Sequence, residues 1–148
     1  MNLAPLTGSA PPAASPAPSG QPGSAQAREI ADLKARDQQV RAHEAAHLTA
    51  AGGLARGGAA YTYERGPDGV AYAVGGEVSI DTSPVPGNPA ATLAKAQQIQ
   101  AAALAPADPS AQDRSVASAA SAMAAQAQRD LQRVQSGKAS GRSLDVVA

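Results

Sequence analysis

The chain has 148 residues, enough for one domain and a short tail. Its twelve basic and twelve acidic side chains give a net charge of zero, and no basic cluster is present, which argues against nucleic acid as a partner. Cysteine, Phe and Trp are absent, so disulfides and thiolate metal ligands are excluded, and the core is expected to be small and built partly from Ala and Val.

Residues 1–26 are rich in Pro, Ala, Ser and Gly, which predicts a disordered leader. They lack the positive start and the apolar stretch of a secretory signal, and no segment of the chain is apolar enough to span a membrane. We therefore expect a cytoplasmic location. The predicted domain covers residues 27–136, and residues 137–148 are expected to form a flexible tail.

The first predicted element is a long helix over residues 27–51. A stripe at three-four spacing defines one face of this helix and becomes polar towards its end. Gly52 and Gly53 then end the helix. Polar side chains that face the core need partners for their buried polar groups, and a metal ion is one such partner. The stripe consists of Ile30, Leu33, Asp37, Val40, Glu44, His47 and Ala51.

A small β-meander is expected next. Residues 60–64 and 70–74 read as strands joined by a Pro- and Asp-Gly-containing turn. Gly75-Gly76 predicts a break or bulge. Residues 77–81 then form a third extended segment, whose alternation places Glu77 and Asp81 on one face.

Two helices complete the predicted domain. Asn88 and Pro89 are suited to the cap and first turn of a helix that reaches about Leu104. Asp108 is the expected cap of a last helix, which begins at Pro109 and reaches about Val134. Together these elements predict an α+β class, a zincin-like minimal domain with a long active-site helix, a small meander and two C-terminal helices.

Both histidines of the chain lie in one motif, His43-Glu44-Ala45-Ala46-His47. Residues four apart on a helix are neighbours, so the two imidazoles can bind one Zn²⁺ ion together. Glu44 is rotated away from the metal and can accept a proton from a water that zinc activates. This pattern predicts a zinc-dependent peptidase in which His43 and His47 bind the metal and Glu44 is the general base. The simpler alternative is two surface histidines on an Ala-rich helix.

The third ligand must be a carboxylate, because no other histidine is available. The longer metallopeptidase motif would need Gly at position 50 and His at position 53, where this chain has Ala50 and Gly53. Four acidic residues follow the motif at plausible distance, namely Glu64, Asp68, Glu77 and Asp81.

Glu77 is the preferred candidate, because the two glycines before it allow a close approach to another element. Asp81 is the runner-up and could instead orient a histidine. Asp68 reads as a turn former and Glu64 as a solvated strand residue.

The three tyrosines, Tyr61, Tyr63 and Tyr72, are the only aromatic residues of the Phe, Trp and Tyr class in the chain. Core packing is their expected role. A less favoured interpretation gives one phenol the task of donating a hydrogen bond to a developing oxyanion.

Six blocks of the sequence have a distinctive composition. They are Arg41-Ala42-His43-Glu44-Ala45-Ala46-His47, Ala51-Gly52-Gly53, Tyr61-Thr62-Tyr63, Gly66-Pro67-Asp68-Gly69, Tyr72-Ala73-Val74-Gly75-Gly76-Glu77-Val78 and Asp81-Thr82-Ser83-Pro84. With these blocks, the sequence over residues 28–134 resembles the SprA-related family of bacterial metalloproteases. The resemblance implies a zinc peptidase with His43 and His47 as ligands and Glu44 as base, and it favours Glu77.

Three hypotheses follow from the sequence. The first is a zinc endopeptidase that acts on a peptide or protein substrate bound along a free sheet edge. The second is a non-catalytic interaction module stabilised by zinc, with Asp81 as a closing ligand. The third is a metal-free helical scaffold.

Overall fold

The computed structural model describes residues 23–142, with side chains as far as residue 137. Residues 1–22 of the predicted leader and 143–148 of the predicted tail lie outside this range. The predicted α+β class is confirmed, with three helices and a two-stranded antiparallel sheet. The elements in chain order are α1 (Ser24–Ala51), a 3₁₀ turn (Gly52–Leu54), β1 (Ala60–Arg65), β2 (Ala71–Glu77), α2 (Pro89–Ala103) and α3 (Ala111–Arg142).

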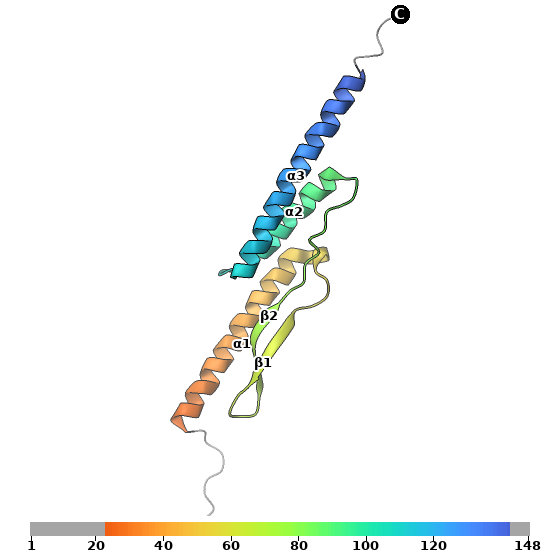
Figure 1. Ribbon diagram of the computed structural model, residues 1–148. Coiled ribbons are helices and arrows are strands. Elements are labelled where there is room, and N and C mark those ends of the chain that lie inside the picture. The colour runs from red at the N-terminus through yellow and green to blue at the C-terminus, as the bar shows by residue number, and fades with distance from the viewer. Residues whose placement is uncertain (1–22, 143–148) are drawn as a thin grey trace, which may run out of the picture.

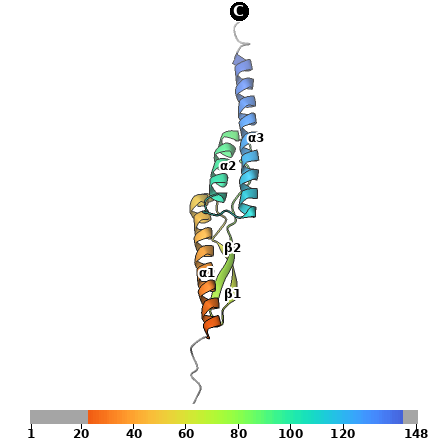
Figure 2. The same cartoon turned by 90° about the vertical axis from the view of Figure 1, so that its left-hand side faces the viewer.

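The elements form two pairs that meet where α1 ends. The β1–β2 hairpin lies along α1, and α2 lies antiparallel to α3 (Figure 1). Seen from the side, the last turns of α1 lie beside the end of α2 and the start of α3 (Figure 2). Side chains from the end of α1 and the start of α3 can therefore meet although they are far apart in the sequence.

Helix α1 buries the predicted stripe. Leu33, Glu44, His47 and Ala51 are buried, and the other stripe residues are half-buried. The helix starts at Ser24, slightly before the predicted residue 27, because the Gln26 side chain accepts a hydrogen bond from the backbone of Gly23 (3.1 Å). The predicted glycine stop is confirmed at Gly52, which has a positive φ of 51°.

The hairpin forms at the predicted turn, but the Gly75-Gly76 pair does not end β2. The strand continues to Glu77, and the register shifts at Thr62/Tyr63 opposite Val74. Side chains of α1 bind the backbone at this bulge: Asp37 Oδ1 accepts from Ala73 N (2.7 Å), and Arg36 Nε donates to Val74 O (2.9 Å). These contacts fix the position of β2 on α1.

The prediction of a third strand over residues 77–81 is wrong, because these residues form no regular strand of their own. Ile80 forms only an isolated antiparallel bridge with Ala55. The bridge rests on two backbone hydrogen bonds, from Arg56 N to Ser79 O and from Asp81 N to Leu54 O, each 2.8 Å. Gly57 and Gly58 then separate this short pairing from β1, so no continuous third strand develops.

Helix α2 follows its predicted signals closely. Asn88 Oδ1 accepts from Ala91 N (3.0 Å), and Pro89 occupies the first turn. The α2–α3 contact is built mainly from alanine, and Ile99 is the largest fully buried side chain of the described residues. The expected small core is confirmed. Its buried apolar residues are Leu33, Ala51, Tyr72, Ala73, Ala96, Ile99, Ala102, Ala103, Ala117, Ala120 and Ala127.

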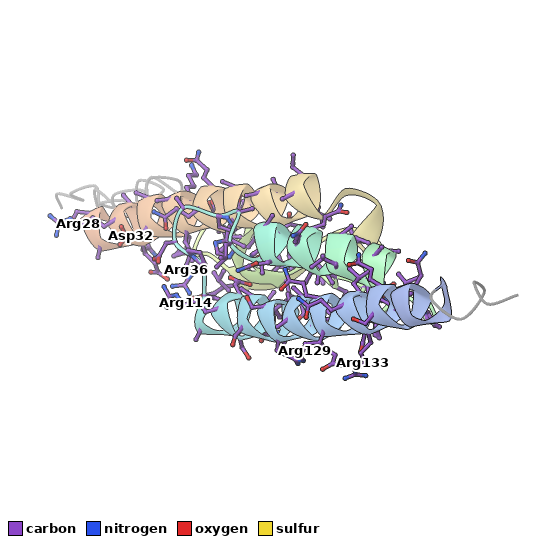
Figure 3. All side chains as sticks on the ribbon, turned by 90° about the horizontal axis from the view of Figure 1, so that it is seen from above. Arg28, Asp32, Arg36, Arg114, Arg129 and Arg133 are labelled. Carbon is purple, nitrogen blue, oxygen red and sulfur yellow. The ribbon has the colours of Figure 1, made fainter. Side chains whose placement is uncertain are left out.

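Helix α3 differs from its prediction at both ends. It begins at Ala111 rather than Pro109, because Ser110 caps it: Ser110 Oγ accepts from Asp113 N (3.1 Å). It continues to Arg142 rather than Val134. Figure 3 shows Arg129 and Arg133 pointing outward from α3, and local contacts such as Arg133–Asp130 (3.2 Å) support this exposed face. None of the helices between residues 23 and 142 is long and apolar enough to cross a membrane.

Asp81 ties the loop after β2 to two other elements. Its carboxylate accepts hydrogen bonds from Lys95 Nζ on α2 and from Arg56 Nη2 before β1, each 2.8 Å, and also from Ser83. The Lys95 and Ser83 hydrogen bonds, with Arg56, lower the pKa of Asp81 far below its ordinary value of 3.8. The carboxylate therefore favours the folded state only while it is ionised.

Asp81→Asn is expected to lower the free energy of unfolding near about pH 7. A depressed pKa in the folded state gives stability that is present above the unfolded value and is lost as the pH falls through the folded value. The difference between wild type and variant should therefore shrink below about pH 4. Urea unfolding at several pH values measures this, with Asp32→Asn, an exposed residue of α1, as control. A pH-independent difference would contradict the expectation.

Candidate metal centre

The two imidazoles lie side by side near the end of α1. His47 is buried, whereas the His43 side chain is 29% exposed. Their Nε2 atoms are 3.2 Å apart, and the rings meet edge to face with centroids 4.8 Å apart. The helical spacing thus directs both nitrogens to one point, as the sequence predicted.

A carboxylate from α3 joins this pair. Asp113 Oδ2 lies 3.4 Å from His43 Nε2, and Asp113 Oδ1 lies 3.3 Å from His47 Nε2. One ligand atom from each of the three residues can be chosen so that all lie within 4.8 Å of one another. His43, His47 and Asp113 could therefore hold a metal ion together.

Helix capping holds Asp113 in place. Its Oδ2 accepts from Ser110 N (2.7 Å) and its own N–H donates to Ser110 Oγ, so the two residues form a capping box. Burial alone would raise the pKa of Asp113, but the hydrogen bonds from Ser110 and the attraction of the imidazoles outweigh burial and lower it. Asp113 is thus an ionised carboxylate, as metal binding requires.

The hydrogen bond on the far side of His47 orients its ring. His47 Nδ1 lies 2.8 Å from Ala102 O, and a carbonyl oxygen can only accept, so Nδ1 carries the proton. The other ring nitrogen, Nε2, then faces the Asp113 carboxylate 3.3 Å away. Two acceptors at this distance repel each other unless a proton or a cation lies between them. The hydrogen bond from His47 Nδ1 to Ala102 O is of the kind that orients metal-binding histidines in proteins.

The Asp113 carboxylate faces both imidazoles, with one oxygen near each ring. The two Nε2 atoms are 3.2 Å apart, Asp113 Oδ1 lies 3.3 Å from His47, and Asp113 Oδ2 lies 3.4 Å from His43. With a single oxygen of Asp113 as ligand, the three ligand atoms lie within 4.8 Å of one another. Two imidazole nitrogens and one carboxylate oxygen are donors of the kind that metal ions bind in proteins.

Glu44 lies on the same helix face and is almost completely buried, at 3% exposure. Its Oε2 has no hydrogen-bond partner among the described residues. Burial raises the pKa of Glu44 above its ordinary value, and the neighbouring His43 and His47 oppose this only in part. A buried carboxylate oxygen needs a hydrogen-bond donor, and residues 23–137 do not supply one to Glu44 Oε2.

Gly76 of β2 makes room for Glu44. A Cβ atom at Gly76 would lie 2.8 Å from Glu44 Cγ and Oε1 and 3.0 Å from Cδ. The close approach predicted for the two glycines therefore exists, but it is made by Gly76 and is directed at Glu44 rather than at a metal ion.

Gly76→Ala is expected to destabilise the fold by about 1–3 kcal/mol, because the added methyl group overpacks against the stem of Glu44. Gly75→Ala is the matched control, since a Cβ there would lie 3.8 Å from Thr62 Cβ, an ordinary contact. Urea unfolding compares the two variants. Equal stability of both would contradict the tight contact between Gly76 and Glu44.

The motif faces a cavity of about 330 Å³ between α1, the end of β2 and the start of α3. Glu77 lines this cavity but is exposed and is not part of the metal-binding group. The structure thus places Asp113, not Glu77, beside the imidazoles. Glu44, Asp113 and Glu77 make the lining acidic, and no Lys or Arg is part of it.

The other sequence candidates lie elsewhere. Asp81 is engaged by Lys95 and Arg56, which leaves it unsuited as a closing ligand. Asp68 has the expected turn role: Oδ1 accepts from Val70 N (3.1 Å), and Oδ2 accepts from the Tyr72 hydroxyl (2.6 Å). Glu64 is exposed on β1, as predicted.

The tyrosines follow the core-packing prediction only in part. Tyr72 is buried, and its hydrogen bond to Asp68 raises the pKa of Tyr72 to about 12. Tyr63 is 53% exposed. Tyr61 is half-buried, with the Arg41 guanidinium 5.1 Å from its ring centroid. None of the three lines the cavity, so the oxyanion interpretation finds no support.

Comparison with protein-family models places the chain in a known family. The model described as the SprA-related family matches residues 19–140. The chain belongs to the SprA-related family. Neither a curated protein nor a solved structure matches the chain. For this SprA-related protein, the chemistry of the site therefore has to be argued from its own side chains.

Sequence reasoning missed Asp113 as a site residue. Its spacing from Ser110 is that of a capping box, a local signal that places a carboxylate in the first turn of α3. The sequence interpretation put the cap at Asp108 instead. No local signal indicates that this first turn packs against His43 and His47, because that contact depends on how α2 and α3 meet α1.

Proposed function

We propose that this SprA-related protein is a zinc-dependent peptidase. His43, His47 and Asp113 hold one Zn²⁺ ion, and Glu44 is the general base. The observation that carries the proposal is the position of the Asp113 carboxylate against both imidazoles, at 3.3 and 3.4 Å, next to a buried Glu44 oxygen without a partner among the described residues. Asp113 takes the place that the sequence interpretation gave to Glu77.

The type of donor favours zinc among common metal ions. Two imidazole nitrogens and one carboxylate oxygen are a typical ligand set for catalytic zinc, whereas Mg²⁺ and Ca²⁺ prefer oxygen ligands alone. Zinc held by these residues supplies Lewis acidity, which polarises a peptide carbonyl and makes water a better nucleophile.

The residues of the chain do the rest of the proposed reaction. Glu44 Oε2 accepts the proton of the attacking water and can return it to the leaving amine. The hydrogen bond from His47 Nδ1 to Ala102 O keeps Nε2 free for the metal, and Ser110 keeps Asp113 in its orientation. Gly76 leaves the space that Glu44 occupies beside the histidines.

Hydrolysis of a mixed peptide library by the full chain tests this proposal. We expect cleavage in the presence of zinc, loss of cleavage after removal of the metal by a chelator, and recovery when zinc is restored. Mass spectrometry of the products identifies the bonds cut. Stoichiometric zinc with no cleavage of any peptide would overturn the peptidase proposal.

A zinc-stabilised interaction module is the second candidate, and one observation favours it. The three ligands join α1 to the start of α3, in a protein whose core contains few large side chains. A metal bound only by the folded chain would add stability there. Zinc-dependent folding without hydrolysis is the result that distinguishes this candidate from the first.

A further inference from the structure

The chain beside the site has a backbone edge that is open to another strand. Ser79 O and Asp81 N both bond to the 54–56 segment. Each peptide unit is planar and trans, so the N–H and C=O of Ile80, which share those two units, point to the opposite side. Neither group of Ile80 forms a hydrogen bond within residues 23–142.

This open edge borders the cavity of the metal site. Glu77, Val78, Ser79 and Ile80 line the cavity together with Glu44 and both histidines. Earlier in β2, strand addition is blocked, because Asp37 and Arg36 of α1 already bind the backbone at Ala73 and Val74. At Ile80, beside the site, no such side chain binds the backbone N–H and C=O within residues 23–142.

The charge of the lining indicates what kind of peptide fits. The two positive charges of a divalent ion would be balanced by Asp113, which contacts both imidazoles, and by Glu44, which is buried on the same helix. Glu77 is exposed at the cavity wall and forms no ion pair among the described residues, and no Lys or Arg lines the cavity. The Glu77 carboxylate is therefore left to pair with a cation supplied by a ligand.

We propose that the substrate is an extended peptide with a basic residue. Its backbone pairs with the N–H and C=O of Ile80 as an added strand, and its Lys or Arg side chain contacts Glu77. Glu44 lines the same cavity, and its buried Oε2 has no partner among the described residues, which favours a ligand that completes the site. This inference rests on the proposed peptidase function and names its substrate class.

Binding of short peptides to the zinc-loaded Glu44→Gln chain tests the inference apart from catalysis. The probes are three capped hexapeptides of Ala and Val that carry Arg, Gln or Glu at the third position. Calorimetry should show about two- to fivefold tighter binding of the Arg peptide than of the Gln peptide, and weaker binding of the Glu peptide. NMR should show slower hydrogen exchange at the Ile80 amide in the complex.

Three changes, two in the protein and one in the peptide, complete the test. Glu77→Gln should remove the preference for Arg, and Glu77→Lys should turn it towards the Glu peptide. N-methylation of the peptide amides that pair with Ile80 should weaken binding. Equal affinities of the three peptides, or an Ile80 amide that the Arg peptide leaves unprotected, would overturn the inference. Selective binding of the Arg peptide, without cleavage by wild type, would support peptide binding at Ile80 and Glu77 and would overturn only the peptidase proposal.

Discussion

Glu44→Gln is expected to reduce peptide hydrolysis by about 10²–10⁴-fold, the usual contribution of general acid–base catalysis. Glutamine has nearly the shape of glutamate, so it should fit the space beside Gly76, but it cannot accept the proton of the attacking water. Zinc should stay bound, because Glu44 is not part of the metal-binding group. Steady-state hydrolysis and metal content of the same preparation measure both effects.

Glu64→Gln is the control for this variant, because Glu64 is an exposed carboxylate of β1 that does not line the cavity. It should hydrolyse peptides as fast as wild type. Hydrolysis by Glu44→Gln at the wild-type rate would show that Glu44 does not act as the base.

The second large effect concerns stability. Zinc at about one hundred times its dissociation constant is expected to raise the free energy of unfolding by about 2.7 kcal/mol, since only the folded chain brings the three ligands together. This is a substantial share of the total free energy of unfolding for a domain with a small alanine-rich core. Urea unfolding with and without zinc measures the difference.

His43→Ala should remove this stabilisation, and Mg²⁺ should not replace zinc in the wild type, because Mg²⁺ prefers oxygen ligands. His43 is partly exposed, so the variant should fold without metal. Equal zinc-dependent stabilisation of His43→Ala and wild type would place the bound zinc elsewhere in the protein.

The parts of the site that lie on one helix could be predicted from the sequence. His43, Glu44 and His47 follow from helical spacing alone, because residues four apart on α1 must lie on one face. The glycine stop, the hairpin turn and the Asn88 cap are likewise local signals, and the structure confirms them.

The third residue of the candidate metal site could not be predicted in this way. Asp113 is brought to the histidines by the antiparallel packing of α2 and α3 and by the position of α2 on α1, which depend on alanine contacts without a distinctive pattern. Glu77 was chosen because two glycines precede it. The two glycines do allow a close approach, but the approach is between Gly76 and the Glu44 side chain, not between Glu77 and the histidines.

The loop after β2 also depends on contacts between distant segments, which the sequence pattern does not show. Alternation over residues 77–81 resembles a strand, but pairing also needs a neighbour, and Gly57-Gly58 leave only the bridge between Ala55 and Ile80. Asp81, predicted near the metal, is drawn instead to Lys95 and Arg56, which the sequence does not place beside it.

Zinc content after exhaustive dialysis, measured by mass spectrometry for wild type, Asp113→Ala and Glu77→Ala, tests the central claim most directly. We expect one zinc ion per chain for wild type and for Glu77→Ala, and a large loss for Asp113→Ala, with circular dichroism confirming that each variant is helical. Full zinc content in Asp113→Ala, together with its loss in Glu77→Ala, would contradict the site described by His43, His47 and Asp113.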